Sequence, residues 1–241
     1  MKKFEICDLH GHFLPGMDDG SRSVAESLQM LELAASQGIG QVFATPHYYP
    51  METVGEFLAR RDQAVAALSE AMARSQKPLP QVIPGAEVAY RPGLGNADDL
   101  EKLCLGNSRF LLLELPFRPW NQSMFRDISS IANVRGILPI IAHVERYIAI
   151  QNTKVFRQLM EQDVLFQINA ESLLSWRTRG QAKRLLKYGS AHLLGSDCHN
   201  MSNRKPNLGE AMSYLQKSSI VGALYQAAEL SMEIFREAQS D

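Results

Sequence analysis

The chain has 241 residues, of which 45% are hydrophobic and 21% charged, and its net charge is −1 at pH 7. This length is enough to bury one substantial core, and the composition excludes a disordered chain. The near-neutral charge argues against a nucleic acid or a membrane surface as a partner held by bulk electrostatics. We therefore expect one globular domain over residues 1–241.

Cysteine usage and the first residues of the chain indicate a compartment. Cys7, Cys104 and Cys198 are an odd and scattered set, so a disulfide framework is not expected and a reducing environment fits. The segment MKKFEICDLHGH reaches Glu5 and Asp8 before any apolar stretch develops, unlike a signal peptide. No run approaches the roughly 18 apolar residues of a membrane span. The sequence predicts a cytoplasmic protein without membrane insertion.

Short apolar runs alternate with longer stretches of helical period along the chain. The runs predict strands at Phe4–Leu9, Gln41–Thr45, Gln81–Pro84, Phe110–Leu115, Leu138–Ala142, Leu165–Ile168 and His192–Gly195. Runs this short, separated by helical patterns, are typical of buried parallel strands in βα units. Such units in one chain predict a TIM-like barrel, one unit short of the usual eight. Strand counting leaves a doubly wound open sheet as the alternative.

The helix-period stretches have recognisable ends. In the first, Ser23 and Glu26 predict a capping box, and Gly38 predicts the end of the helix. The other predicted helices are Val54–Ser75, Ser123–Asn133, Lys154–Gln162, Thr178–Tyr188, Leu208–Lys217 and Ile220–Ala238. Neither a repeat nor a linker divides the chain, which agrees with a single domain.

Histidines and carboxylates follow nearly all of the predicted strands. These residues are His10, His12, His47, Glu87, Glu114, His143, Asp197 and His199. A parallel barrel gathers the carboxyl ends of its strands on one face, so side chains distant in sequence converge there. Imidazole nitrogens and carboxylate oxygens suit zinc, manganese and iron. The pattern predicts a metal centre.

The His10-x-His12 pair has a geometric basis in a strand. Residues two apart point to the same side of an extended chain, so both imidazoles can reach one ion. A lone pair of this kind is more often no site at all, and a buried glutamate at a strand end often just pairs with a cation. Five of the six histidines nevertheless fall at strand ends. His192, at the start of a strand, is the exception, and we expect it to be structural.

The motifs DLHGH, PGMDDG, ATPH, PGAE, LLELP, AHVER and SDCHN resemble the polymerase-and-histidinol-phosphatase (PHP) superfamily. They are more closely similar to its bacterial protein-tyrosine phosphatases of capsule and exopolysaccharide biosynthesis. The resemblance extends in order from Asp8 to Arg204. It implies an α/β fold, a distorted TIM-like (β/α)7 barrel of the PHP type, with a cluster of three divalent metal ions. Manganese is the foremost candidate, with iron, zinc, cobalt or magnesium as alternatives.

The resemblance also implies a role for each residue of the centre. The first ion is assigned to His10, His12, Glu87 and Asp197. The second is assigned to Glu87, Glu114 and His143, and the third to Asp19, His47 and His199. Asp19 is preferred to Asp18 on the family spacing from His10. Arg146 and Arg204 are implied to bind the substrate phosphate.

The chain departs from the family pattern at three positions. The family commonly has Pro where Val144 stands, a second His where Tyr48 stands, and Ala where Cys198 stands. None of these changes removes an implied ligand, but the change after His47 alters the rim of the substrate pocket. Phe117 and Trp120 follow Glu114 and are candidates for an aromatic wall beside the substrate; packing within their loop is the alternative.

The chemistry of the implied centre favours a phosphate ester. Four carboxylates against three divalent ions leave a charge of about +2, which attracts an anion. Water activated by the ions would attack phosphorus in line, while the ions and both arginines stabilise the equatorial oxygens. A tyrosine phenolate, with a pKa near 10, is an easy leaving group. The resemblance implies a phosphotyrosine protein as substrate, namely an autophosphorylating bacterial tyrosine kinase of polysaccharide assembly.

Three other functions are alternatives for a chain with these motifs. Cys198 and Arg204 have the C-x5-R spacing of cysteine-dependent phosphatases, but the intervening HNMSN lacks the glycine that usually helps the backbone to cradle a phosphate. A related enzyme could instead hydrolyse histidinol phosphate or another small phosphomonoester. A non-enzymatic regulator with a dead site is disfavoured, because the whole ligand set and both arginines are retained.

Overall fold

The computed structural model describes residues 5–240. Phe4 of the first predicted strand, and both ends of the predicted domain 1–241, lie outside the described residues. None of the helices within residues 5–240 is long and apolar enough to cross a membrane.

All paired strands are parallel, and they form two sheets. The first contains, in order, β1 (Cys7–Asp8), β2 (Gln41–Ala44) and β4 (Gln81–Pro84). The second contains β3 (His47–Tyr48), β5 (Glu87–Ala89), β6 (Phe110–Glu114), β7 (Leu138–Ile141), β8 (Leu165–Asn169) and β9 (Leu193–Gly195). This agrees with the expectation of parallel βα units.

The two sheets are parts of one curved wall. β2 continues into β3 and β4 into β5, and the amide of Gly85 donates to the carbonyl of Ala44 at 2.9 Å across the interruption. Gly85 has no room for a side chain, since a Cβ would lie 2.7 Å from Cδ2 of Leu105. β2 with β3, and β4 with β5, each count as one interrupted strand of the wall. The nine segments therefore make seven continuous strands, which we call staves.

Backbone hydrogen bonds join the first stave to the last. The amide of Asp197 donates to the carbonyl of His10, and that of His12 donates to the carbonyl of Cys198, both at 2.8 Å. Gly11 and Cys198 form a parallel bridge at the same place. The sheets thus close into a (β/α)7 barrel, as predicted, and the alternative of an open doubly wound sheet is wrong.

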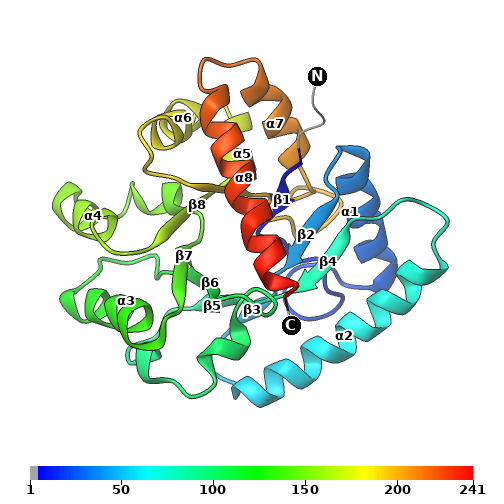
Figure 1. Ribbon diagram of the computed structural model, residues 1–241, viewed down its shortest axis with the longest axis horizontal. Coiled ribbons are helices and arrows are strands. Elements are labelled where there is room, and N and C mark those ends of the chain that lie inside the picture. The colour runs from blue at the N-terminus through cyan, green and yellow to red at the C-terminus, as the bar shows by residue number, and fades with distance from the viewer. Residues whose placement is uncertain (1–4, 241) are drawn as a thin grey trace.

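Helices surround the barrel (Figure 1). They are α1 (Val24–Ser36), α2 (Val54–Arg74), α3 (Gln122–Arg135), α4 (Thr153–Met160), α5 (Ala170–Leu174), α6 (Arg179–Lys187), α7 (Leu208–Gln216) and α8 (Val221–Ala238). Short 3-10 helices are η1 (Leu94–Asn96), η2 (Leu100–Leu103) and η3 (Val144–Tyr147). The sequence did not predict α5 or the 3-10 helices.

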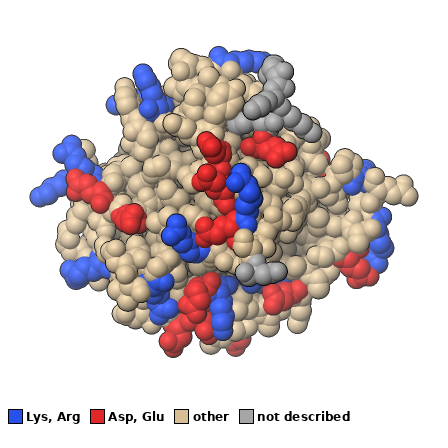
Figure 2. All heavy atoms as spheres, viewed as in Figure 1, with Lys and Arg blue, Asp and Glu red and all other residues tan. Residues whose placement is uncertain are grey.

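The last helix, α8, closes one end of the barrel. In Figure 1 it runs across the middle of the ring of strands. Ile234, Phe235 and Ala238 pack into a buried apolar cluster with Phe43 and other residues of the barrel interior. Figure 2 shows charged side chains of both signs on the outer face at this end. α8 therefore seals the amino end, and the carboxyl ends of the strands open on the opposite side.

The helices α1 and α2 begin with different N-terminal caps. Thr53 and Glu56 form a complete capping box at the start of α2. At α1, the Ser23 hydroxyl accepts from the amide of Glu26, but the Glu26 carboxylate accepts from Arg22 rather than from Ser23. The predicted capping box at α1 is therefore only half right: the Ser23 hydroxyl caps the helix, but the reciprocal bond from the Ser23 amide to the Glu26 carboxylate is not formed. Ser23 has φ of −156° where Thr53 has −74°, and this rotates the Ser23 amide away from the glutamate.

Candidate metal centre and phosphate site

The structure brings all nine predicted ligands to the carboxyl ends of the staves. Eight of them lie in a strand or within four residues of its carboxyl end, and the ninth, Asp19, comes from the loop that precedes α1. Because the staves are parallel and adjacent, these side chains converge on one cluster, which is largely buried except at Asp19, whose side chain is 66% exposed.

Glu87, the first residue of β5, lies at the centre of the cluster. Its Oε2 lies 3.1 Å from Nε2 of His10, 3.3 Å from Nε2 of His12 and 3.2 Å from Nδ1 of His47. Its Oε1 lies 3.1 Å from Nε2 of His143. Burial opposes ionisation of Glu87, but the surrounding imidazoles outweigh it and hold its pKa well below the usual range. One carboxylate therefore links four imidazoles.

The ligand atoms fall into three overlapping groups, with the atoms of each group within 4.8 Å of one another. The groups are His10, His12, Glu87 and Asp197; His12, Asp19, His47 and His199; and His47, Glu87 and Glu114. The first has the same members as the predicted first ligand set. The second contains the predicted third set together with His12. The remaining predicted set has His143 in place of His47, and Nε2 of His143 lies 3.5 Å from Oε1 of Glu114.

The cluster fits divalent metal ions. Among the described residues, Nδ1 of His47, Oε2 of Glu87 and Nε2 of His199 are buried in the cluster without a hydrogen bond of normal geometry. Buried polar atoms are nearly always satisfied, so unsatisfied atoms that converge call for a partner. Imidazole nitrogens and carboxylate oxygens are ligands of zinc, manganese and iron.

Without ions, the cluster holds protons. Burial disfavours the charged form of His143, but hydrogen bonds with Glu114 and Glu87 outweigh it and raise the pKa of His143 to about 9. The same competition raises the pKa of His12, where Asp18 contributes the largest favourable hydrogen bond. Because a ligand must be deprotonated, an ion that binds here displaces protons.

Two of the candidate ligands have strained backbones. Three non-glycine residues among those described have positive φ, and two of them are His143 (34°) and Asp197 (53°). Such conformations cost free energy and concentrate at functional sites. The strain at both positions supports a functional role for the cluster.

Asp18 supports the cluster, and the sequence analysis missed this role. Its Oδ2 accepts a 2.7 Å bond from the amide of His47 and lies 2.7 Å from Nδ1 of His12. This contact fixes the ring so that Nε2 of His12 faces Glu87, as carboxylates behind metal-bound histidines do. Gly20 makes the close approach possible, because a Cβ there would lie 2.4 Å from Cβ of His12. Asp19 instead faces His199, with Oδ1 3.4 Å from Nε2.

Two amides on β8 connect ligands that follow three different strands. Oε1 of Gln167 accepts from the amide of His143 at 2.8 Å and lies 3.3 Å from Nδ1 of His10. Nε2 of Gln167 donates to Oδ1 of Asn169 at 3.0 Å, and Nδ2 of Asn169 donates to Oδ2 of Asp197 at 2.7 Å. The chain of bonds orients three candidate ligands at once. Sequence reasoning missed both amides.

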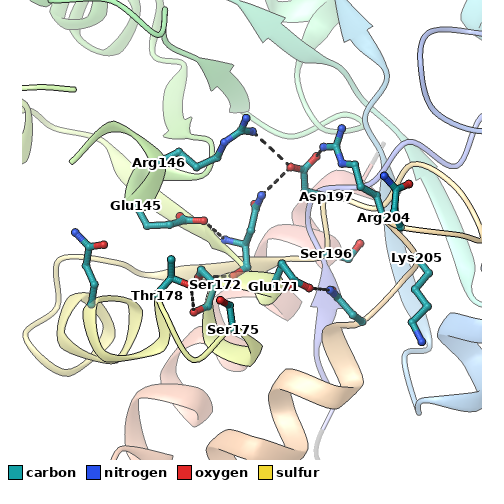
Figure 3. A pocket seen from close by; sticks show the side chains of 14 residues that line it. Glu145, Arg146, Glu171, Ser172, Ser175, Thr178, Ser196, Asp197, Arg204 and Lys205 are labelled. Carbon is teal, nitrogen blue, oxygen red and sulfur yellow. Dashed lines mark hydrogen bonds and ion pairs between the residues drawn. The ribbon is translucent and has the colours of Figure 1, made fainter. Parts of the chain in front are cut away.

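The two predicted phosphate-binding arginines flank Asp197 (Figure 3). Nη2 of Arg204 donates to Oδ1 of Asp197 at 2.8 Å, and Nη1 of Arg146 lies 3.9 Å from Oδ2. The Arg146 guanidinium lies 4.6 Å from the centre of the Phe117 ring. Both cations therefore stand at the edge of the cluster, where they can meet an anion bound to it.

Aromatic rings border the cluster differently from the prediction. Phe117 is half exposed and stacks on His143, with ring centres 5.7 Å apart. Trp120 is buried, and its Nε1 donates to the carbonyl of Pro116 at 3.0 Å. Trp120 is therefore part of the loop packing. Tyr49, which is half exposed, stacks on His47 at 5.0 Å.

Cys198 cannot serve as a nucleophile in this structure. Its side chain is fully buried, and burial raises the pKa of the thiol well above the usual value. A thiolate is needed for nucleophilic attack, so a high pKa in a buried position indicates an inert residue. The C-x5-R spacing to Arg204 is a coincidence of sequence.

The fold and the site together define a parallel barrel with a metal-binding cluster at the carboxyl ends of its strands. The chain belongs to the family described as capsular polysaccharide synthesis, CpsB/CapC, whose model matches residues 6–230.

Relatives extend over nearly the whole chain. The tyrosine-protein phosphatase YwqE of Bacillus subtilis is 32% identical, over 96% of this chain and 94% of the relative. The tyrosine-protein phosphatase CpsB of Streptococcus agalactiae is 30% identical, over 86% of this chain and 88% of the relative. The resemblance to bacterial tyrosine phosphatases of capsule biosynthesis is confirmed.

Solved structures support the same placement. A structure from a study of YwqE from Bacillus subtilis and CpsB from Streptococcus pneumoniae, described as metal-dependent tyrosine phosphatases, has a TM-score of 0.83 and 28% identity. It covers 96% of this chain, and 95% of that chain is covered. An inactive dihydroorotase-like domain from Chaetomium thermophilum, with a TM-score of 0.55 and 11% identity, shares the fold alone.

Proposed function

We propose that the chain is a metal-dependent protein-tyrosine phosphatase, a phosphoric monoester hydrolase, formed by one domain over residues 1–241. One observation carries the proposal. A buried cluster of imidazoles and carboxylates centred on Glu87 stands next to Arg146 and Arg204, in a chain whose relatives are named tyrosine-protein phosphatases.

The cluster is proposed to hold three divalent ions, with manganese as the foremost candidate. The ligands would be His10, His12, Asp19, His47, Glu87, Glu114, His143, Asp197 and His199. Unsatisfied buried nitrogens and oxygens at several of these residues support the assignment. Bound divalent ions would supply activated water near neutral pH and would polarise the phosphoryl group.

The residues around the cluster are proposed to bind and orient the substrate. Arg146 and Arg204 would each pair with phosphoryl oxygens through a planar guanidinium, which suits an anion with several oxygens. Phe117 and Tyr49 would contact the tyrosine ring, since both are half exposed beside candidate ligands. The leaving phenolate has a pKa near 10, so it needs little help from a general acid.

The proposed substrate is a phosphotyrosine protein in the cytoplasm, namely an autophosphorylating bacterial tyrosine kinase of polysaccharide assembly. Support comes from the resemblance and from the description of the family as one of capsular polysaccharide synthesis. Histidinol phosphate, the alternative substrate, is not favoured, because the relatives carry the names of tyrosine phosphatases.

The proposal is tested by hydrolysis of a phosphotyrosine peptide, with histidinol phosphate as the competing substrate. We expect activity on the peptide to disappear with a chelator, to return with Mn²⁺ and to survive Cys198→Ala. Elemental analysis of the protein as purified would give the number and identity of its ions. Activity that resists chelation and disappears with Cys198→Ala would refute the metal mechanism. A clear preference for histidinol phosphate would refute the substrate.

A further inference from the structure

A cavity of about 510 Å³ lies beside the proposed phosphate position. It lies between η3, α5 and the loop that follows β9, and its lining includes Arg146, Asp197 and Arg204 (Figure 3). Its volume falls within the range of about 300–1,000 Å³ that is typical of ligand pockets. A substrate whose phosphate lies between the two arginines would therefore place neighbouring atoms at the mouth of this cavity.

Two buried oxygens in the wall of the cavity have no hydrogen-bond partner within residues 5–240. Glu145 is 9% exposed and Asn207 is 7% exposed. Oε1 of Glu145 accepts from the amide of Asn169 at 3.1 Å, but Oε2 of Glu145 and Oδ1 of Asn207 are unpartnered. Unsatisfied buried acceptors are rare, so these two oxygens point to a ligand that donates hydrogen bonds.

A second carboxylate lies next to them. Glu171 on α5 lines the same cavity, and its Oε2 accepts from Nδ2 of Asn207 at 3.2 Å. This bond orients the Asn207 amide so that its Oδ1 remains available as an acceptor. Glu171 thus brings a negative charge to a wall that also offers two buried acceptor oxygens, one on Glu145 and one on Asn207.

Three hydroxyl donors of the cavity wall are already used. The Ser172 hydroxyl donates to the carbonyl of Asn169 at 2.6 Å, and that of Thr178 donates to the carbonyl of Ser172 at 2.9 Å. The Ser196 hydroxyl donates to the carbonyl of His10 at 3.2 Å. Lys205 also lines the cavity, and its ammonium nitrogen lies 3.8 Å from Oε1 of Glu210. The wall formed by Glu145, Glu171 and Asn207 therefore offers acceptors, and a complementary ligand is a cation with several N–H groups.

We propose that this cavity binds a basic side chain, lysine or arginine, of the phosphoprotein substrate at a position near the phosphotyrosine. The inference rests on the proposed function and adds a determinant of sequence specificity to it. The ammonium or guanidinium group would donate to Glu145, to Glu171 and to Oδ1 of Asn207, while the phosphate meets Arg146 and Arg204. The substrate would thus present its negative and positive groups to opposite charges in adjacent sites.

The test compares the manganese-loaded enzyme on matched phosphotyrosine peptides. A single lysine is placed in turn at each of the four positions on either side of the phosphotyrosine, with alanine elsewhere, and a second series carries glutamate instead. We expect one lysine position to raise kcat/KM about tenfold over alanine, the size of a charge-assisted hydrogen bond. Glu171→Gln should remove most of this advantage. Hydrolysis of p-nitrophenyl phosphate, which has no flanking residue, monitors the metal centre, and each result is expressed relative to it.

A matched control separates the cavity from charge in general. Glu233→Gln removes an exposed carboxylate from α8 at the opposite end of the barrel and should leave the lysine advantage intact. Equal rates on all peptides, a preference for glutamate, or a lysine advantage that survives Glu171→Gln would each overturn the inference alone. Hydrolysis of p-nitrophenyl phosphate without hydrolysis of any phosphotyrosine peptide would overturn the proposed function, and the inference with it.

Discussion

The amino end of the barrel is closed by the apolar face of a helix, whereas the carboxyl end carries buried histidines and carboxylates. At the amino end, Phe235 of α8 meets Phe43 of β2 edge to face, with ring centres 5.5 Å apart, inside a cluster of apolar residues. At the carboxyl end of the same staves, His10, His12 and Glu87 are at most 1% exposed. Both ends are buried, but exclusion of water by itself stabilises only the apolar amino end.

The difference separates the residues that hold the fold from those that carry chemistry. Burial of apolar surface at the amino end contributes roughly 25 cal/mol per Å². At the carboxyl end, each buried polar atom without a partner costs about 1–3 kcal/mol in the ion-free protein. Divalent ions would satisfy these atoms, so their binding should stabilise the folded state as well as provide catalysis. Substitutions at the two ends should therefore change different quantities.

The largest expected effect is loss of activity on Glu87→Gln. Glu87 is within 3.3 Å of four imidazoles, and removal of its charge should release ions. We expect kcat/KM to fall roughly 10⁴-fold, which corresponds to a loss of about 5 kcal/mol of transition-state stabilisation. Phosphotyrosine hydrolysis and elemental analysis of the same preparation check both effects. Glu233→Gln on α8 is the matched control. A Glu87→Gln variant with full metal content and activity would show that the cluster is not the catalytic centre.

At the other end, Phe235→Ala should change stability rather than chemistry. The ring is 2% exposed, and its removal should lower the free energy of unfolding by about 3–5 kcal/mol through lost burial and a cavity. Urea unfolding measures the loss. Folded protein should keep its metal content and its specific activity, because α8 contributes no candidate ligand. A large drop in specific activity at unchanged fold would mean that the two ends are coupled.

A smaller effect is expected from Asn169→Ala, which touches the metal centre only through another residue. Loss of its 2.7 Å bond to Asp197 should weaken manganese binding about 10- to 100-fold, as other supporting contacts of metal ligands do. Titration calorimetry on the ion-free protein gives the affinity. Asn203→Ala, an exposed amide on the loop after β9, is the control. Unchanged affinity together with reduced stability would indicate a purely structural role for Asn169.

The sequence could predict the features that have a local pattern, but not those that depend on contacts between distant residues. The strand Gln81–Pro84 has the predicted bounds, and the candidate ligands could be proposed because a polar residue at the end of an apolar run is a local pattern. The segment His47–Tyr48 could not be predicted as a strand, since two residues carry no period and pairing with Glu87–Ala89 defines it.

The supporting residues have no local pattern either. Gln167 lies 157 residues from His10 in sequence, and Asn169 lies 28 residues from Asp197, so only the closed barrel brings these partners together. Asp18 is next to Asp19 in the chain, but the loop before α1 points the two carboxylates at different histidines. A sequence motif locates such residues without saying which one touches an ion.

The smallest expected effect is a change in the pH dependence of stability caused by His192, at the amino end of the barrel. Nδ1 of His192 accepts from the amide of Phe166 at 3.0 Å, and burial lowers the pKa of this imidazole. Because the unfolded chain binds the proton more readily, the folded state should lose stability as pH falls through about 6.5.

His192→Asn isolates this contribution, since it removes the titrating group at a position with no candidate ligand nearby in sequence. Urea unfolding at pH 7.5 and pH 5.5 should show a fall in stability on acidification that is smaller in the variant, by less than about 1 kcal/mol. The metal centre titrates in both proteins and cancels in the difference. An identical fall would mean that protonation of His192 does not contribute to the pH dependence of stability.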